Sequence, residues 1–277
     1  MLEHLHYLEH LLHHDNLDAI SGTAKPSSQE ENTLTEPIFP AQDSNDQHVG
    51  DMMQEHKPPG TIRMYHINLN GIKWDNEGGS WLDVCQTMDA CNADIVGLVE
   101  LNQDVGQYTL TKKMDSICSA TFQHHCLIMS TSNHKVCNTY KPGGSAALVC
   151  NDMTAMVQSW SRDRMGRWTS IRFSGQDGKH IRFIIAYQVC QTISKGTNTT
   201  AAQQQATLIA ESIVEDTMER ILPRPAFLRD LQQFIVAAQQ EGDVIILCGD
   251  FNETMTEQNS GIAKLAANCG LIDIFSL

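Results

Sequence analysis

The stretch that most constrains this 277-residue chain is DVIILCGDFN, at residues 243–252. Its apolar run is short, continuous and followed by glycine, which is typical of a strand buried on both faces. A carboxylate and a carboxamide, Asp250 and Asn252, then stand where such a strand ends. Gly, Asp and Asn also form ordinary turns, so this stretch alone leaves open a simple strand-to-turn junction. Polar residues at other strand ends favour a cleft instead.

Three upstream stretches repeat this arrangement. TIRMYHINLNG, at residues 61–71, alternates apolar and polar residues and ends in Asn68 and Asn70. The apolar run of ADIVGLVELN carries Glu100 at its far end. Such a carboxylate needs a cation, water or another partner; a salt bridge or a cap on the next helix is the alternative. The strand 181–187 ends in Tyr187 and follows a hairpin turn at Gly175–Gly178.

The order of the remaining elements predicts the fold class. Apolar spacing predicts helices over 81–91, 201–222 and 227–240 and a short helix over 262–267. Pro223 and Pro225 are expected to end the helix before them. A strand is expected within 142–151, and LIDIF near the end of the sequence favours an extended segment. This order predicts an α/β protein, a two-layered α/β sandwich of mixed or antiparallel sheets.

The first 59 residues differ in composition from the rest. They contain 11 Asp and Glu against 2 Lys and Arg, a charge of −9 within a total of −14. Leucines at helical spacing with interleaved histidines predict a solvated amphipathic helix within residues 1–20; histidine pairs four residues apart leave a metal site as the alternative. Residues 21–59 are polar and predict a disordered linker. We therefore expect an acidic segment at 1–59 and a folded domain at 60–277.

Composition excludes several classes. Residues 60–277 carry 22 acidic against 17 basic residues, so they offer no broad cationic field for nucleic acid. A DNA-binding chain of this kind needs metal ions or a local basic patch. The cluster Arg162, Arg164 and Arg167 is interpreted as a solvated loop or the border of a phosphate site. Nine cysteines without a CxxC motif, no secretory signal and no membrane-spanning window predict an intracellular protein, nuclear or cytoplasmic.

The side chains expected at the strand ends share one chemistry. They are hard oxygen donors and hydrogen-bonding groups, which suit Mg²⁺ and a phosphate better than zinc. The set comprises Asn68, Glu100, Tyr187, Asp250 and Asn252.

Four motifs in this order resemble one known family. HINLNG, IVGLVELN, IIAYQV and ILCGDFN are similar to the first motif, the metal-glutamate motif, the tyrosine strand and the Gly-Asp-x-Asn motif of the endonuclease/exonuclease/phosphatase superfamily, which has the DNase I-like fold. The resemblance covers residues 61–277. GGSAALV, GRW and PRPAFLRDL further resemble the endonuclease-like region of non-LTR retrotransposons. The resemblance implies a Mg²⁺-dependent nuclease whose partner is DNA.

The resemblance also implies a role for each residue. Glu100 holds the divalent cation, Mg²⁺ or Mn²⁺, and Asn68 helps to orient the metal or the phosphate. Tyr187 contacts the scissile phosphate. Asp250 orients or deprotonates the attacking water, and Asn252 binds a non-bridging oxygen. This set fits phosphodiester hydrolysis, which needs an in-line nucleophile and neutralisation of negative charge.

The sequence departs from the family pattern after Asn252. The pattern closes with a further aspartate and a Ser-Asp-His motif, but no histidine follows His180 here. Asp273 comes too soon to replace that aspartate, and Asn70 takes only a flanking role. We therefore expect a C-terminally truncated domain without its closing strands and with impaired or absent activity. A phosphatase or phosphodiesterase for inositol or lipid phosphates, and a catalytically dead binding protein, remain the alternatives.

Overall fold

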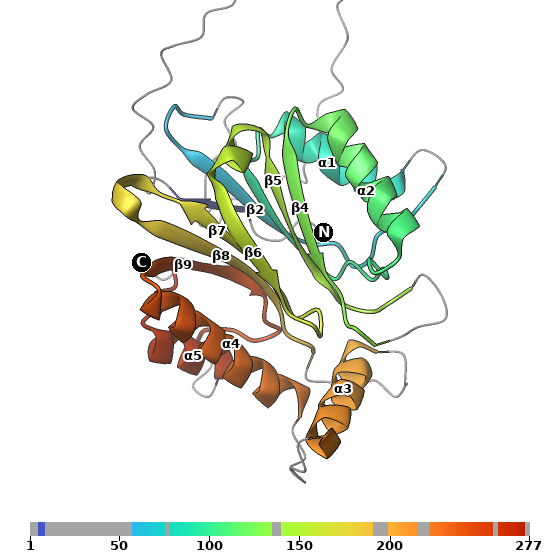
Figure 1. Ribbon diagram of the computed structural model, residues 1–277, viewed down its shortest axis with the longest axis vertical. Coiled ribbons are helices and arrows are strands. Elements are labelled where there is room, and N and C mark those ends of the chain that lie inside the picture. Colours follow the sequence, from blue (N-terminus) through green and yellow to red (C-terminus); the bar gives the residue numbers. More distant parts are fainter. Residues whose placement is uncertain are drawn as a thin grey trace, which may run out of the picture.

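The computed structural model describes residues 5–8, 57–75, 78–134, 140–190, 199–214, 222–256 and 260–274 (Figure 1). The strands are β1 (Leu5–Leu8), β2 (Ile62–Asn68), β3 (Ile95–Val99), β4 (His125–Ser130), β5 (Ser145–Cys150), β6 (Val157–Arg162), β7 (Trp168–Ser174), β8 (His180–Tyr187) and β9 (Asp243–Asp250). The helices are α1 (Gly79–Ala90), α2 (Tyr108–Thr121), α3 (Thr200–Val214), α4 (Pro223–Gln240) and α5 (Gly261–Cys269), with short 3-10 turns at Asn151–Met156 and Gln176–Gly178.

These strands form two mixed sheets. The first has the order β1-β2-β3-β5-β4, and the second has the order β6-β7-β8-β9. Each sheet contains one parallel pair, β2 with β3 and β8 with β9, and its other neighbours are antiparallel. The predicted α/β class with mixed sheets is confirmed, as is the hairpin of β7 and β8.

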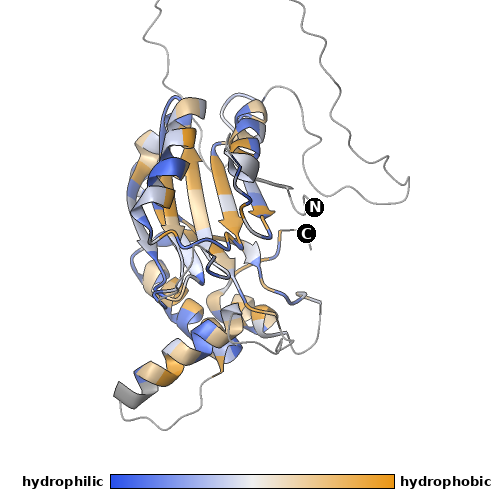
Figure 2. Cartoon of the chain, turned by 90° about the vertical axis from the view of Figure 1, so that its right-hand side faces the viewer, coloured by the Kyte–Doolittle hydropathy of each residue, from blue (hydrophilic) through white to orange (hydrophobic). Residues whose placement is uncertain are grey.

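Hydrophobic clusters hold the sheets and helices together in layers. Successive strand residues point to opposite faces, so Val96 and Leu98 of β3 pack under α1 and α2 while Val99 packs between the sheets. In β8, Phe183 packs between the sheets and Ile184 packs against α4 and α5. The two sheets therefore lie face to face with helices outside them, and Figure 2 shows the apolar strands between the helices.

A glycine permits the close approach of the two sheets. A Cβ on Gly97, in the middle of β3, would lie 2.9 Å from Ile185 Cγ1 and 3.4 Å from Cys248 Sγ. Both neighbours belong to the second sheet, in β8 and β9. The missing side chain thus lets β3 pack directly on the two strands whose ends carry Tyr187 and Asp250.

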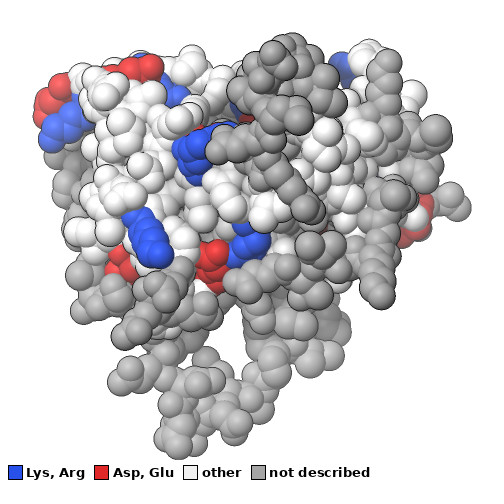
Figure 3. Space-filling model, turned by 90° about the horizontal axis from the view of Figure 1, so that it is seen from below, with Lys and Arg blue, Asp and Glu red and all other residues white. Residues whose placement is uncertain are grey.

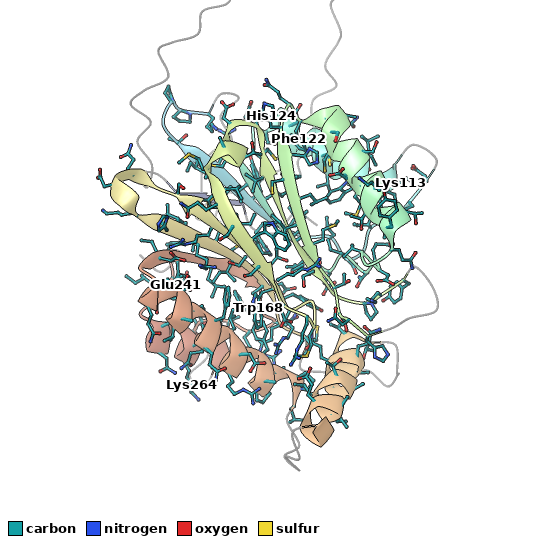
Figure 4. All side chains as sticks on the ribbon, in the orientation of Figure 1. Lys113, Phe122, His124, Trp168, Glu241 and Lys264 are labelled. Carbon is teal, nitrogen blue, oxygen red and sulfur yellow. The ribbon has the colours of Figure 1, made fainter. Side chains whose placement is uncertain are left out.

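Two of the sequence motifs, GRW and PRPAFLRDL, pack against each other on the outer face of the second sheet. In GRW, Arg167 forms an ion pair with Asp230 of α4, with Nη1 and Oδ2 2.9 Å apart. The ring of Trp168 lies 6.2 Å from that of Phe227 and 5.9 Å from that of Phe234. Figure 4 shows Trp168 on the side of the sheet that α4 covers. The contacts between these two motifs therefore hold α4 against the second sheet.

Two predicted elements are wrong. The helix within residues 1–20 is contradicted at Leu5–Leu8, which form β1 because the outer edge of β2 offers unpaired backbone groups to an extended segment. Residues 9–56 lie outside the described residues. Pro223 and Pro225, which are expected to end the preceding helix, stand in the first turn of α4, where proline's missing N–H has no partner to lose. Residues 215–221, where that helix would end, lie outside the described residues.

The second wrong element is the extended LIDIF segment, of which residues 271–274 form no strand. Helix α5 ends at Gly270 in a left-handed conformation, and Leu271 N–H bonds Ala266 O at 2.9 Å. This closure turns the chain back onto α5. None of the described helices has the length and apolarity that a membrane crossing requires.

Candidate active site

The two parallel pairs place four strand ends together. In the first sheet Asn68 is registered with Val99, so Glu100 follows at the same end. In the second sheet Tyr187 is registered with Asp250. Parallel strands finish at a common edge of a sheet, which is where ligands bind in α/β proteins. The structure thus explains why polar residues follow these four apolar strands.

One hydrogen bond and one charge interaction join these ends across the gap between the sheets. Asn68 Nδ2 donates to Asp250 Oδ2 at 2.8 Å. The carboxylate of Glu100 acts on the hydroxyl of Tyr187. Burial and this neighbouring carboxylate raise the pKa of Tyr187 above its ordinary value. Tyr187 therefore stays protonated and remains a hydrogen-bond donor.

Asn252 is fixed by the two strands that flank it. Its backbone N–H donates to Asp250 Oδ1 at 3.0 Å, and its side-chain Nδ2 donates to Gln188 O at 2.7 Å. Its Oδ1 accepts from Cys190 Sγ at 3.2 Å. The backbone φ of Asn252 is 49°, in the left-handed region that asparagine tolerates better than most residues. The carboxamide therefore has a defined orientation beside Asp250.

Glu100 stands in an uncommon backbone conformation. Its φ is 53°, and its carbonyl accepts from Gly71 N at 2.8 Å. Asn70 nearby also has a positive φ, 45°, and its N–H donates to Asn68 Oδ1 at 2.9 Å. Left-handed non-glycine residues cluster at functional sites. Glu100 is not a helix cap, because Gln107 occupies that position of α2.

The donor set fits a hard divalent cation. Glu100 and Asp250 come from different sheets, yet their charges both act on the Tyr187 hydroxyl and the Cys190 thiol. Among the described residues, neither carboxylate forms an ion pair. The described part of the chain holds no cluster of three or more His, Cys, Asp or Glu ligands. Mg²⁺ needs fewer, because it keeps several waters and uses one or two carboxylates.

The arginine cluster has structural contacts. Arg167 Nε lies 2.9 Å from Asp163 Oδ2, and both side chains are buried, at 4% and 6% exposure. Arg164 pairs with Glu211, and Arg162 Nη1 donates to Met129 O at 3.3 Å. The interpretation as a solvated loop is therefore wrong for Arg167. On the face shown in Figure 3, basic side chains lie singly among acidic and uncharged ones.

The sequence reasoning missed a second group of residues beside the site. Arg224, in the first turn of α4, forms an ion pair with Glu253. Arg224 Nη1 also donates to the carbonyl of Val189, 2.5 Å away. The available signals were local: Glu253 directly follows Asn252, and Val189 and Cys190 follow the tyrosine strand. Arg224 belongs to PRPAFLRDL, but nothing in that motif indicates that it would lie beside Asn252.

Glu253 is expected to make the stability of the folded chain depend on pH. Although burial alone would raise its pKa, hydrogen bonds from Ile262 N–H, Arg224 and Ser260 lower it below the ordinary glutamate value. A lowered folded-state pKa contributes stability above the unfolded-state pKa that is lost as pH falls through the folded one. We expect Glu253→Gln to lower the free energy of unfolding at pH 7 by about 1.5–3 kcal/mol.

The same linkage between protonation and folding predicts how the stability difference between Glu253→Gln and the native chain changes with pH. The difference between Glu253→Gln and the native chain is expected to shrink as pH falls below the ordinary glutamate range, because the native carboxylate is then protonated as well. Urea unfolding from pH 7 to pH 3 measures it. A deficit that stays constant over this range would contradict the lowered pKa.

Comparison with known proteins places the chain in a family. It is similar to an endonuclease/exonuclease/phosphatase family protein from Leptotrichia buccalis C-1013-b, with 12% identity, 75% of this chain and 74% of that chain covered and a TM-score of 0.42. It is also similar to the Xenopus laevis APE2 catalytic domain, with 15% identity, coverage of 75% and 64% and a TM-score of 0.42.

A third similar structure is a Staphylococcus aureus beta toxin mutant with bound magnesium ions, with 11% identity, coverage of 70% and 64% and a TM-score of 0.41. No curated protein matches the chain. The model of the Endonuclease/Exonuclease/phosphatase family matches residues 66–265, which is well over half of the sequence. The chain therefore belongs to the endonuclease/exonuclease/phosphatase family.

Proposed function

We propose that residues 60–277 form a hydrolase domain that binds Mg²⁺ or Mn²⁺ and cleaves phosphodiesters in DNA. The observation that carries this proposal is the meeting of Glu100 and Asp250 at the ends of two parallel strand pairs, with no cationic side chain paired to either among the described residues. Two such carboxylates repel each other. A divalent cation and a phosphate would make this arrangement favourable.

Each side chain has a task in this proposal. Glu100 and Asn68 would hold the metal ion, which supplies charge neutralisation for the phosphate. Tyr187 stays protonated and donates a hydrogen bond to a phosphate oxygen. Asp250 is fixed by Asn68 and by the Asn252 backbone, so its carboxylate is oriented to accept a proton from the attacking water. One Nδ2 proton of Asn252 stays on Gln188 O, and the second donates to a non-bridging oxygen.

The proposed rate is low. The resemblance implies a catalytic histidine after Asn252, and residues 253–277 contain none. A positioned general acid contributes about 10²–10⁴-fold in rate, so we expect the 277-residue chain by itself to be impaired by that amount. The closer likeness to a retrotransposon endonuclease belongs to the same proposal. It rests on GGSAALV and on the two motifs that pack together at Arg167 and Trp168.

Nicking of supercoiled plasmid tests the proposal, because one cleavage among thousands of phosphodiesters converts the whole molecule to the relaxed form. The purified chain is expected to nick slowly with MgCl₂ and not with EDTA. Glu100→Gln is expected to lose about 10–100-fold in rate because the metal is held less tightly. Glu241→Gln is the matched control, since its side chain is 61% exposed and pairs with Arg182 at the far end of β8.

The outcomes separate the candidate functions. Nicking that resists EDTA or that Glu100→Gln leaves unchanged would contradict the assigned site. No nicking above the EDTA control would remove the nuclease function for this chain. In that case, release of phosphate from a soluble inositol phosphate would support the phosphatase function of the same family.

A further inference from the structure

We propose that Arg224 and Glu253 form a positioning pair, which holds the segment after β8 and the Asn252 carboxamide in register for phosphate binding. Neither residue belongs to the set that the sequence predicts. The inference rests on the proposed function for its purpose, but the contacts that carry it are independent of any reaction.

Glu253 is anchored by the start of α5. Its Oε2 accepts from Ser260 Oγ at 3.0 Å and from the backbone N–H of Ile262 at 2.9 Å. Ser260 is also the N-cap of α5, because its Oγ accepts from Ala263 N at 3.3 Å. The other oxygen, Oε1, accepts from Arg224 Nη2. With a side chain only 8% exposed, Glu253 is a fixed acceptor between α5 and α4.

Arg224 links Glu253 to the segment that follows β8. Its Nη1 donates to Val189 O at 2.5 Å, while Nη2 is held by Glu253. The guanidinium is rigid and planar, so one arginine can bridge a carboxylate and a carbonyl with a fixed geometry. Val189 lies between Gln188 and Cys190, whose carbonyl and thiol contact Asn252. Three consecutive residues after Tyr187 are therefore tied to Asn252 and Glu253.

These side-chain contacts begin where the sheet ends. The ladder between β8 and β9 finishes with Tyr187 and Asp250, and one further backbone bond joins Gln188 N to Asp250 O at 2.9 Å. Residues 251–256 form no helix or strand. Beyond the ladder, the position of Asn252 thus depends on its own contacts and on the Arg224–Glu253 pair. A misplacement of about 1 Å near reacting atoms costs on the order of 100-fold in rate.

Four variants test the pair with plasmid nicking as the readout. Arg224→Ala and Glu253→Ala are each expected to lower the Mg²⁺-dependent rate by about 10–100-fold. The double variant is expected to lose no more than the single ones, because either change breaks the same bridge. Arg224→Lys is expected to restore less than full activity, because it cannot bridge both acceptors with one plane. Arg229→Ala, on the same helix with a 49% exposed side chain, is the control.

A second readout separates positioning from a loss of metal or of fold. Mn²⁺ affinity is expected to stay within about twofold of the native value in all four variants, because neither Arg224 nor Glu253 is a proposed ligand. Additive losses in the double variant, or an equal loss of Mn²⁺ affinity, would overturn the positioning role. So would native nicking rates in both single variants.

The third readout does not need an active enzyme. In the native chain the Asn252 side-chain amide donates to Gln188 O, so its ¹⁵N-bound protons are expected to exchange slowly with solvent. Arg224→Ala is expected to speed this exchange by about tenfold or more, corresponding to about 1.4 kcal/mol. If the native chain fails to nick plasmid but Arg224→Ala speeds exchange, the proposed function is lost and the positioning pair stands. Unchanged exchange in Arg224→Ala would overturn the pair itself.

Discussion

Asp250→Asn is expected to lower the Mg²⁺-dependent nicking rate by about 10²–10⁴-fold. The substitution keeps the size of the side chain but removes its charge and its capacity to accept a proton. It also leaves a donor facing either Asn68 Nδ2 or the Asn252 backbone N–H, both of which donate to Asp250 in the native chain. Initial nicking rates of equal protein concentrations, with thermal unfolding to check the fold, measure the effect.

Asp177→Asn is the matched control for this experiment. Asp177 is exposed and lies just before β8, at the opposite end of that strand from Tyr187. Its φ of 56° is left-handed, a conformation that asparagine accepts readily. We expect native nicking from this variant. A similar fall in rate for both variants, or an unchanged rate for Asp250→Asn, would remove Asp250 from the site.

Arg167→Met is expected to lower the free energy of unfolding by about 3–5 kcal/mol, because it leaves a buried carboxylate without its partner. Arg167 Nη2 lies 3.0 Å from Asp163 Oδ1 and Nε lies 2.9 Å from Asp163 Oδ2. The same guanidinium reaches Asp230 of α4 at 2.9 Å. Methionine replaces the apolar part of the side chain but none of these three bonds. Urea unfolding at neutral pH measures the loss.

Arg164→Met provides the comparison, since Arg164 pairs with Glu211 but its side chain is 61% exposed. Exposed pairs contribute about 0–1 kcal/mol, so this variant is expected to unfold near the native denaturant concentration. Because the backbone carbonyl of Arg167 accepts from Tyr187 N at 2.7 Å, Arg167→Met is also expected to disturb the tyrosine of the site. Equal stability of the two methionine variants would contradict a structural role for Arg167.

The strand ends of the site were predictable from the sequence for a physical reason. A continuous apolar run makes Val96–Val99 and Val244–Leu247 stand out, and the polar residue after each run is visible at once. Burial on both faces is confirmed for β3 but wrong for β9, which is the last strand of its sheet and leaves Val244 42% exposed. Their pairing across sheets was not predictable. Which strands are parallel, and that Asn68 would meet Asp250, depends on contacts between residues 182 positions apart.

Helix α2 and strand β6 have weak hydrophobic patterns in the sequence because each is only partly buried. Helix α2 buries fully only Met114 and Cys118, and its lysines and threonines hide the helical period. Strand β6 lies at a sheet edge with Trp160 exposed at 53%. The Arg167 ion pair was misread for the opposite reason. A charged residue in a polar run is usually solvated, and only the fold places Asp163 and Asp230 around it.

The convergence of Glu100 and Asp250 on one cation is tested most directly by Mn²⁺ binding, followed by electron paramagnetic resonance of the free ion. The account predicts a Mn²⁺ site in the native chain and in Glu241→Gln. It predicts binding at least about tenfold weaker in Glu100→Gln, which loses a ligand, and in Asp250→Asn, which loses a nearby negative charge and the acceptor that orients Asn68. Mn²⁺ that does not bind, or that binds equally to all four proteins, would contradict a shared cation site between the two sheets.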